Sequence, residues 1–197
     1  QLPDLRRRHA LAVAAAKGSP SITTVEIPEP FSVGAADAAL FAQATVGHDK
    51  ASLTLVKSDL RKHLDDPDFL KAYADASPKD VTAFQGLPAD VADKLNRLRL
   101  QVAVQQPDCP QRLKDLWDRL TNKHNDYYQA DVFLLGYDNI GNGHAAVSFG
   151  NPDTAANTAV YVPGTGSYLD NANKDLDRAQ TLYTSANDTN KAGSTAS

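Results

Sequence analysis

The stretch that decides the fold is Thr158-Ala159-Val160-Tyr161-Val162-Pro163-Gly164-Thr165-Gly166-Ser167. β-branched and aromatic residues at 158–162 predict a short strand, and Pro-Gly-Thr-Gly ends it. From Leu169 to Ala186, small and apolar residues recur at helical spacing, which predicts a helix. A strand, a glycine-rich turn and a helix in this order are typical of α/β proteins. Residues 187–197 are polar and small, and they predict a disordered tail or a loop.

Two more strands are predicted immediately upstream. The apolar runs 131–137 and 144–150 are separated by Asp138-Asn139-Ile140-Gly141-Asn142-Gly143, in which Asn-Gly can adopt positive φ. Together they predict a β-hairpin. The fold class expected is therefore α/β, or α+β for the residues in hand: a helical N-terminal region followed by three strands and one helix.

The first part of the chain has the pattern of helices. Apolar spacing predicts helices up to about Lys17, over 35–45 and over 51–64, with an extended connector or edge strand at 21–31. Ser77-Pro78 resembles an N-cap followed by proline at the first helical position. Two apolar stripes joined by a proline-rich turn predict a helical hairpin near 88–124. We therefore expect a helical region at 1–128 and an α/β segment at 129–197.

Composition excludes some classes of function. Hydrophobic residues make up 42% and charged residues 22%, an ordinary globular balance. A net charge of −4 argues against a nucleic-acid surface, so no nucleic-acid partner is expected. No apolar run reaches the roughly 18–20 residues of a transmembrane helix. The chain has no Met and begins with Gln, so we expect that an N-terminal segment has been lost. The compartment stays open between cytoplasmic and secreted.

The chemistry expected at the glycine-rich turn comes from its backbone. Glycine next to a strand end lets the chain turn sharply and approach a ligand. N–H groups of the turn and of the first turn of the following helix lack partners, so they could face an oxyanion or a phosphate. Pro163-Gly164-Thr165-Gly166-Ser167 has neither the lysine nor the spacing of a nucleotide P-loop. On these residues alone, a purely structural turn is the simplest interpretation.

Other residues give weaker indications. The five histidines form no ligand spacing, and the 138–143 turn lacks the closing Glu of a calcium loop, so no metal site and no cofactor are predicted. His144 begins a strand and is interpreted as structural. Asp175 and Asp177 lie two apart on a helix and are interpreted as solvent-facing charges.

Several short stretches together resemble one known family. They are Phe133-Leu-Leu-Gly-Tyr-Asp, Gly150-Asn-Pro-Asp-Thr, Asn157-Thr-Ala-Val-Tyr-Val-Pro-Gly-Thr-Gly-Ser, Leu176-Asp-Arg-Ala and, upstream, Gly86-Leu-Pro-Ala-Asp-Val. They resemble an actinobacterial α/β-hydrolase family formerly catalogued as a domain of unknown function. The resemblance covers about residues 86–187, and its most specific part is Tyr161 to Gly166 with the preceding Asn151-Pro152-Asp153-Thr154.

The resemblance implies a serine-type hydrolase of which this chain carries the N-terminal part. The three strands and the helix would be the first of an α/β-hydrolase sheet. Thr165 and Gly166 would supply oxyanion-stabilising N–H groups on the loop after the third strand. The nucleophile elbow, the acid and the histidine of the triad would follow later, and no Gly-x-Ser-x-Gly occurs in these residues. The implied partners are a small acyl or ester substrate and the C-terminal remainder of the domain, from the same gene or a second chain.

Two alternatives stay open. The chain could be a non-enzymatic helical interaction or secreted module with a degenerate α/β scaffold, in which case a partner would have to cover its exposed edge strand. It could also bind phosphate through the Gly-Thr-Gly turn, although no Lys or Arg flanks that turn before Lys174.

Overall fold

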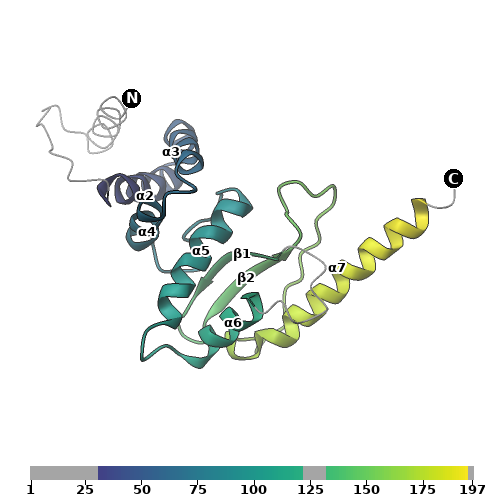
Figure 1. Cartoon of the computed structure of the whole chain (residues 1–197). Coiled ribbons are helices and arrows are strands. Elements are labelled where there is room, and N and C mark those ends of the chain that lie inside the picture. Colours follow the sequence, from purple (N-terminus) through teal and green to yellow (C-terminus); the bar gives the residue numbers. More distant parts are fainter. Residues whose placement is uncertain (1–30, 122–131, 195–197) are drawn as a thin grey trace, which may run out of the picture. The chain divides into compact units, whose positions relative to one another are not determined.

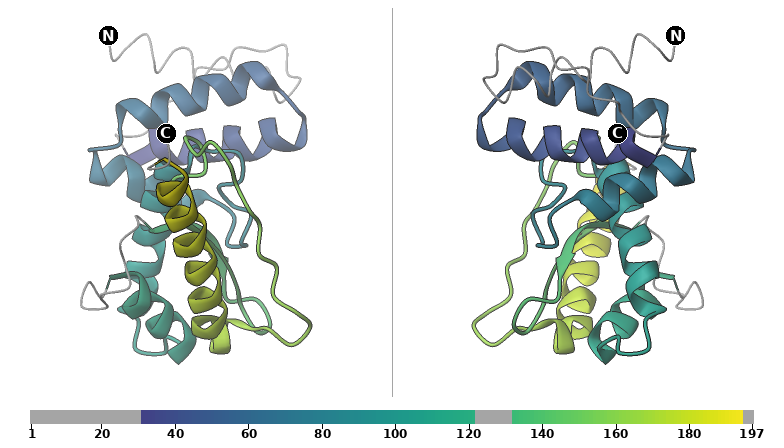
Figure 2. Two further views of the ribbon diagram at one scale, coloured as in Figure 1. Left: turned by 90° about the vertical axis from the view of Figure 1, so that its right-hand side faces the viewer. Right: turned by 90° about the vertical axis from the view of Figure 1, so that its left-hand side faces the viewer.

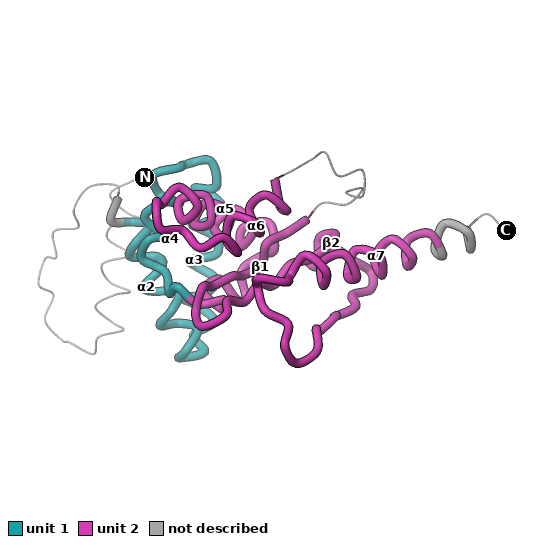
Figure 3. Tube along the Cα trace, turned by 90° about the horizontal axis from the view of Figure 1, so that it is seen from below, with its two compact units in different colours: residues 1–79 teal, residues 80–197 magenta. Residues whose placement is uncertain are grey.

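A computed structural model describes residues 31–121 and 132–194, and it divides the chain into two compact units, 1–79 and 80–197. Figure 3 colours the two units separately. The helix predicted up to Lys17 and the connector at 21–31 lie outside the described residues, apart from residue 31, which begins a helix. Residues 122–131 also lie outside the described residues; they include the end of the predicted helical region at 128 and the first residue of the strand predicted at 131–137.

Residues 31–79, the described part of the first unit, contain three helices, α2 (Phe31–Val46), α3 (Lys50–Lys62) and α4 (Pro67–Ala76) (Figure 1). α2 is rich in alanine, and small side chains let helices approach closely. At Gly34 an added Cβ would collide with the backbone carbonyl of Phe69 in α4, so this position leaves no room for a side chain. Large side chains complete the core, namely Leu40, Phe41, Val56, Leu60, Phe69, Leu70 and Tyr73.

The caps of α4 correct one prediction. Asp66 accepts hydrogen bonds from the N–H groups of Asp68 and Phe69, and Pro67 occupies the first helical turn. The N-cap and proline pair therefore lies at 66–67. Ser77 ends α4 instead of beginning a helix, and its hydroxyl donates to the carbonyl of Tyr73. Residues 81–86 form turns.

The second unit contains a β-hairpin and the helices packed on it. α5 (Ala89–Val104) and α6 (Gln111–Thr121) precede the strands β1 (Val132–Asp138) and β2 (His144–Phe149), and the 3₁₀ turn η1 (Leu169–Asn171) leads into α7 (Ala172–Ser194) (Figure 1). The hairpin was predicted at nearly these positions. α5 and α6 occupy the region of the predicted helical hairpin and belong to the same unit as the strands, while the predicted boundary at residue 128 stays a prediction.

The strands pair antiparallel, with Val132 opposite Phe149 and Asp138 opposite His144. The register shifts between Leu134 and Gly136, which leaves Leu135 as a bulge residue. The turn uses two glycines with positive φ, Gly141 and Gly143, as its sequence predicted.

One face of the hairpin packs on a cluster of buried residues from α5, α6, the loop between them, β1 and η1. Its members are Leu100, Cys109, Leu113, Leu116, Leu134, Tyr137 and Leu169, with Trp117 and Val147 at its margin. α7 contacts β2 through Tyr183, whose ring centroid lies 6.4 Å from that of Phe149.

The strand predicted at 158–162 is not formed, so within the described residues the sheet has two strands and not three. Figure 2 shows the connection from β2 to α7 as a long loop. Val160 and Val162 are 84% and 77% exposed. A strand is stable only when a neighbour pairs with its N–H and C=O groups, and this segment lacks one in the described part of the chain.

The tail predicted at 187–197 is also corrected. α7 continues to Ser194, because Ala, Asn, Asp and Lys can all extend a helix that is already nucleated and packed at its N-terminal end. Composition alone did not indicate this.

Candidate functional site

The glycine-rich loop forms a tight, exposed turn. The N–H of Ser167 donates to the carbonyl of Gly164 at 3.2 Å, which closes a four-residue turn with Thr165 and Gly166 at its centre. Gly166 has φ +93°, as the third position of a type II turn requires. An added Cβ at Gly164 or Gly166 would meet nothing within 4 Å, so the turn borders open space.

Neighbouring elements hold both ends of the loop. On its N-terminal side, the hydroxyl of Tyr161 donates to Asp175 of α7 at 3.3 Å. On its C-terminal side, the N–H of Leu169 donates to the carbonyl of Asn142 in the hairpin turn at 3.3 Å. Asp175 is thus not merely a solvent-facing charge, and Asp177 is paired with Arg119 of α6.

These bonds change which N–H groups are available. We expected free N–H groups both in the turn and at the start of the helix. At the helix start, the N–H of Tyr168 donates to the side chain of Asn171 at 2.8 Å, and Leu169 is bonded to Asn142. In the described residues, the N–H groups of Thr165 and Gly166 have no protein acceptor. Two adjacent free backbone donors could bind a carbonyl oxygen or an anion.

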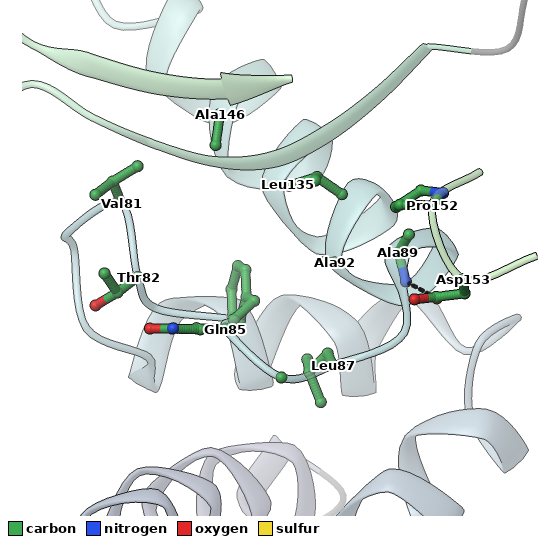
Figure 4. A pocket seen from close by; sticks show the side chains of 12 residues that line it. Val81, Thr82, Gln85, Leu87, Ala89, Ala92, Leu135, Ala146, Pro152 and Asp153 are labelled. Carbon is green, nitrogen blue, oxygen red and sulfur yellow. Dashed lines mark hydrogen bonds between the residues drawn. The ribbon is translucent and has the colours of Figure 1, made fainter. Parts of the chain in front are cut away.

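A pocket of about 390 Å³ lies elsewhere in the second unit, beside Leu135 and Ala146 of the hairpin. Its lining is mostly apolar: Val81, Thr82, Phe84, Gln85, Gly86, Leu87, Ala89, Ala92, Leu135, Ala146, Pro152 and Asp153. Figure 4 shows Asp153 beside the N-terminus of α5, where its carboxylate accepts the N–H of Ala89 at 2.6 Å. Thr165 and Gly166 do not line this pocket.

Asp138 ties together three segments near the pocket. Its carboxylate accepts from the N–H of Val81 at 3.2 Å and of Ile140 at 3.0 Å, and it bonds Nδ1 of His144 at 2.9 Å. Burial opposes ionisation of Asp138, but the hydrogen bond from His144 and those from the backbone outweigh burial and hold its pKa below the usual range. His144 is thus bonded to Asp138 within the hairpin, a contact that we did not predict from the sequence. Asp138 ends one predicted strand and His144 begins the next across a short turn, so the two residues face each other, and this spacing could have predicted the contact.

Among residues 31–121 and 132–194, no group of three or more His, Cys, Asp or Glu side chains is arranged to hold a metal ion. In the same ranges, no helix is both long and apolar enough to cross a membrane.

Comparison with known proteins concerns the C-terminal part of the chain. Residues 138–197, from the last residue of β1 through α7, match the family model of alpha/beta hydrolases. A stretch of 39 residues is 56% identical to the uncharacterized protein Rv2079 of Mycobacterium tuberculosis strain H37Rv. The uncharacterized protein MT2140 of strain CDC 1551 matches equally.

The matches to these relatives are short. Each covers 18% of this chain and 6% of the relative, so the chain spans only a small part of their length. No solved structure matches the chain. The hairpin turn, the glycine-rich loop and α7 thus lie in a segment that is similar to an alpha/beta hydrolase.

Proposed function

We propose that this chain is the N-terminal portion of a serine-type α/β-hydrolase that cleaves an ester or related acyl bond. It contributes the oxyanion-side loop, while the nucleophilic serine comes from outside these 197 residues. We also propose that it belongs to an actinobacterial α/β-hydrolase family formerly catalogued as a domain of unknown function. The mycobacterial source of two uncharacterized relatives supports it.

The observation that carries the proposal is the pair of unoccupied donors at Thr165 and Gly166, inside the segment that matches alpha/beta hydrolases. When a serine attacks an ester carbonyl, negative charge develops on the carbonyl oxygen. Fixed N–H groups stabilise that charge without having to reorient during the reaction. The turn is held at both ends by Tyr161 and Leu169, so its donors are preorganised.

The roles of the other components follow from this arrangement. A serine outside the chain attacks the acyl carbon, and a histidine base, also outside it, accepts the serine proton. The tetrahedral intermediate collapses as the histidine passes this proton to the departing alcohol. Water, deprotonated by the same histidine, then attacks the acyl-enzyme, and the serine leaves with the proton as the acid is released. The substrate is a small acyl compound, and the partner is the remainder of the domain, encoded after Ser197 or supplied by a second chain.

The gene sequence after Ser197 gives the first test. A further strand and a Gly-x-Ser-x-Gly motif within about 80 residues would support the proposal. A stop codon directly after Ser197, with no second chain that carries such a motif, would contradict the proposal and would favour the non-enzymatic interaction module.

The loop itself is tested by backbone substitution in the protein that includes the remainder. Thr165→Pro removes one donor N–H, and Thr165→Ala keeps it. We expect Thr165→Pro to lower kcat for a p-nitrophenyl ester by about 10²–10³-fold with little change in KM. Thr165→Ala should stay close to the unmodified protein. Equal activity of the two variants would remove the oxyanion role from this residue.

A further inference from the structure

The loop that carries the glycine-rich turn contacts the rest of the second unit at few points. Residues 155–166 are exposed apart from one half-buried proline, so packing holds them weakly. In the described part of the chain, two hydrogen bonds join this segment to another element. The hydroxyl of Tyr161 donates to Asp175 at 3.3 Å, and the carbonyl of Gly166 accepts from Nδ2 of Asn171 at 3.4 Å.

The two side chains that hold the loop lie at the start of one helix. Asn171 is the last residue of η1, and Asp175 lies four residues later, in the first turn of α7. Positions i and i+4 of a helix share a face. The stretch from Tyr161 to Gly166 is therefore bonded to a single face of this helix, once on each side of Gly164.

Both supporting side chains are held in place by a second partner. While Nδ2 of Asn171 donates to Gly166, its Oδ1 accepts the N–H of Tyr168 at 2.8 Å. The carboxylate of Asp175 also accepts from Nη1 of Arg178 at 3.1 Å, and its side chain is only 13% exposed. Because each side chain makes two bonds, neither can rotate without breaking both. The loop is thus bonded to fixed groups.

The conformation of the turn explains why such support matters. Gly166 has φ +93°, and glycine adopts either sign of φ at little cost. The peptide between Thr165 and Gly166 can therefore flip between the type II and type I arrangements, which reverses the direction of the Gly166 N–H. Glycine permits the observed turn but does not select it. Bonds on both sides of this peptide favour one direction.

We infer that Asn171 and Asp175 are positioning residues for the turn that stabilises the oxyanion. The inference rests on the proposed function, in which the N–H groups of Thr165 and Gly166 face the developing charge. Asp175 acts through Tyr161, and Asn171 acts through the carbonyl of Gly166. Fixed donors stabilise the transition state because they do not have to reorient. Loosening the turn therefore lowers kcat more than it weakens substrate binding.

A double-mutant cycle in the protein that includes the remainder tests the role of Asp175. Tyr161→Phe removes the donor hydroxyl, and Asp175→Ala removes its acceptor. A misplacement of about 1 Å can cost about 10²-fold in rate, so we expect each variant to lower kcat for a p-nitrophenyl ester by about 10–100-fold, with KM nearly unchanged. The double variant should lose no more than either single variant, because all three lack the same bond. Additive losses, or an unchanged kcat in both single variants, would overturn the inference.

Three further variants separate positioning from a general effect on α7. Asp175→Asn keeps an oxygen acceptor for Tyr161 and should retain most of kcat. Asn171→Asp keeps the acceptor for Tyr168 but loses the donor to Gly166, so kcat should fall. Asp177→Ala is the matched control, because Asp177 lies on the same helix and pairs with Arg119. If Asp177→Ala lowers kcat as much as Asp175→Ala, the loop contact is not the cause and the inference is wrong.

NMR relaxation of ¹⁵N in residues 1–197 gives a readout that does not depend on activity. We expect an order parameter of about 0.85 for the Gly166 N–H in the unmodified chain and below about 0.6 in Asp175→Ala. If the unmodified longer protein hydrolyses no ester, the proposed function fails, and this fall still supports the positioning of the turn by Asp175. An unchanged order parameter in both Asp175→Ala and Asn171→Asp would contradict the inference, even where the longer protein is an active esterase.

Discussion

Asp93 of α5 accepts the N–H of Leu134 at the outer edge of β1, at 2.6 Å, and removing its carboxylate tests how much this bond stabilises the second unit. In Asp93→Ala, the N–H of Leu134, a completely buried residue, loses its acceptor. A buried N–H without a partner costs about 1–3 kcal/mol. The lost pair with Arg97, whose side chain is 26% exposed, adds less than about 1 kcal/mol. The higher helix propensity of alanine offsets about 0.5 kcal/mol of this loss of stability. We therefore expect the free energy of unfolding of the second unit to fall by about 2 kcal/mol.

Trp117 is the chain's one tryptophan and lies at the margin of the buried cluster in the second unit. Its fluorescence therefore reports the unfolding of that unit in urea or on heating. A loss of 2 kcal/mol corresponds to a fall in Tm of about 8 °C for a unit of this size. Asp118→Ala on α6 is the matched control, because Asp118 is exposed. If Asp93→Ala and Asp118→Ala unfold at the same urea concentration, the bond from Asp93 to Leu134 does not stabilise the second unit.

Two further substitutions test the packing and the electrostatics of the second unit. Gly136→Ala should destabilise it by about 1–3 kcal/mol, because the added methyl would collide with the backbone carbonyl of Val81, whereas Gly164→Ala should be neutral in the same Trp117 assay. The pKa of Asp138 is lowered in the folded protein, so its carboxylate stabilises the fold above about pH 4 and loses this effect as pH falls through the folded pKa. The stability difference between the unmodified protein and Asp138→Asn should therefore be larger at pH 6 than at pH 3. A constant difference would show that ionisation of Asp138 is irrelevant to folding.

The elements that local sequence determines were predicted well. The hairpin follows from two apolar runs on either side of a turn that contains Asn142-Gly143, and the helix after Leu169 follows from its spacing. The strand predicted at 158–162 is not formed. Its residues favour extended structure, but a strand also needs a neighbouring strand to pair with, and local sequence does not reveal that neighbour.

The details of the site depend on contacts between distant residues. The bonds from Asp93 to Leu134 and from Tyr161 to Asp175 join different elements, and spacing along the chain predicts neither. The turn at 164–167 was predicted from its glycines, but the use of the helix-start N–H groups by Asn142 and Asn171 was not. The pocket is formed by segments that come together only in the folded unit.

The most direct test of the central claim is the identification of the nucleophile by a fluorophosphonate probe. The probe forms a covalent bond with an activated serine, and mass spectrometry then locates the labelled residue. For the protein that includes the sequence after Ser197, we predict a single labelled serine outside residues 1–197, and no labelling of residues 1–197 on their own. Labelling of a serine within the chain, such as Ser167 beside the glycine-rich turn, would contradict the claim that this chain holds the loop without its nucleophile.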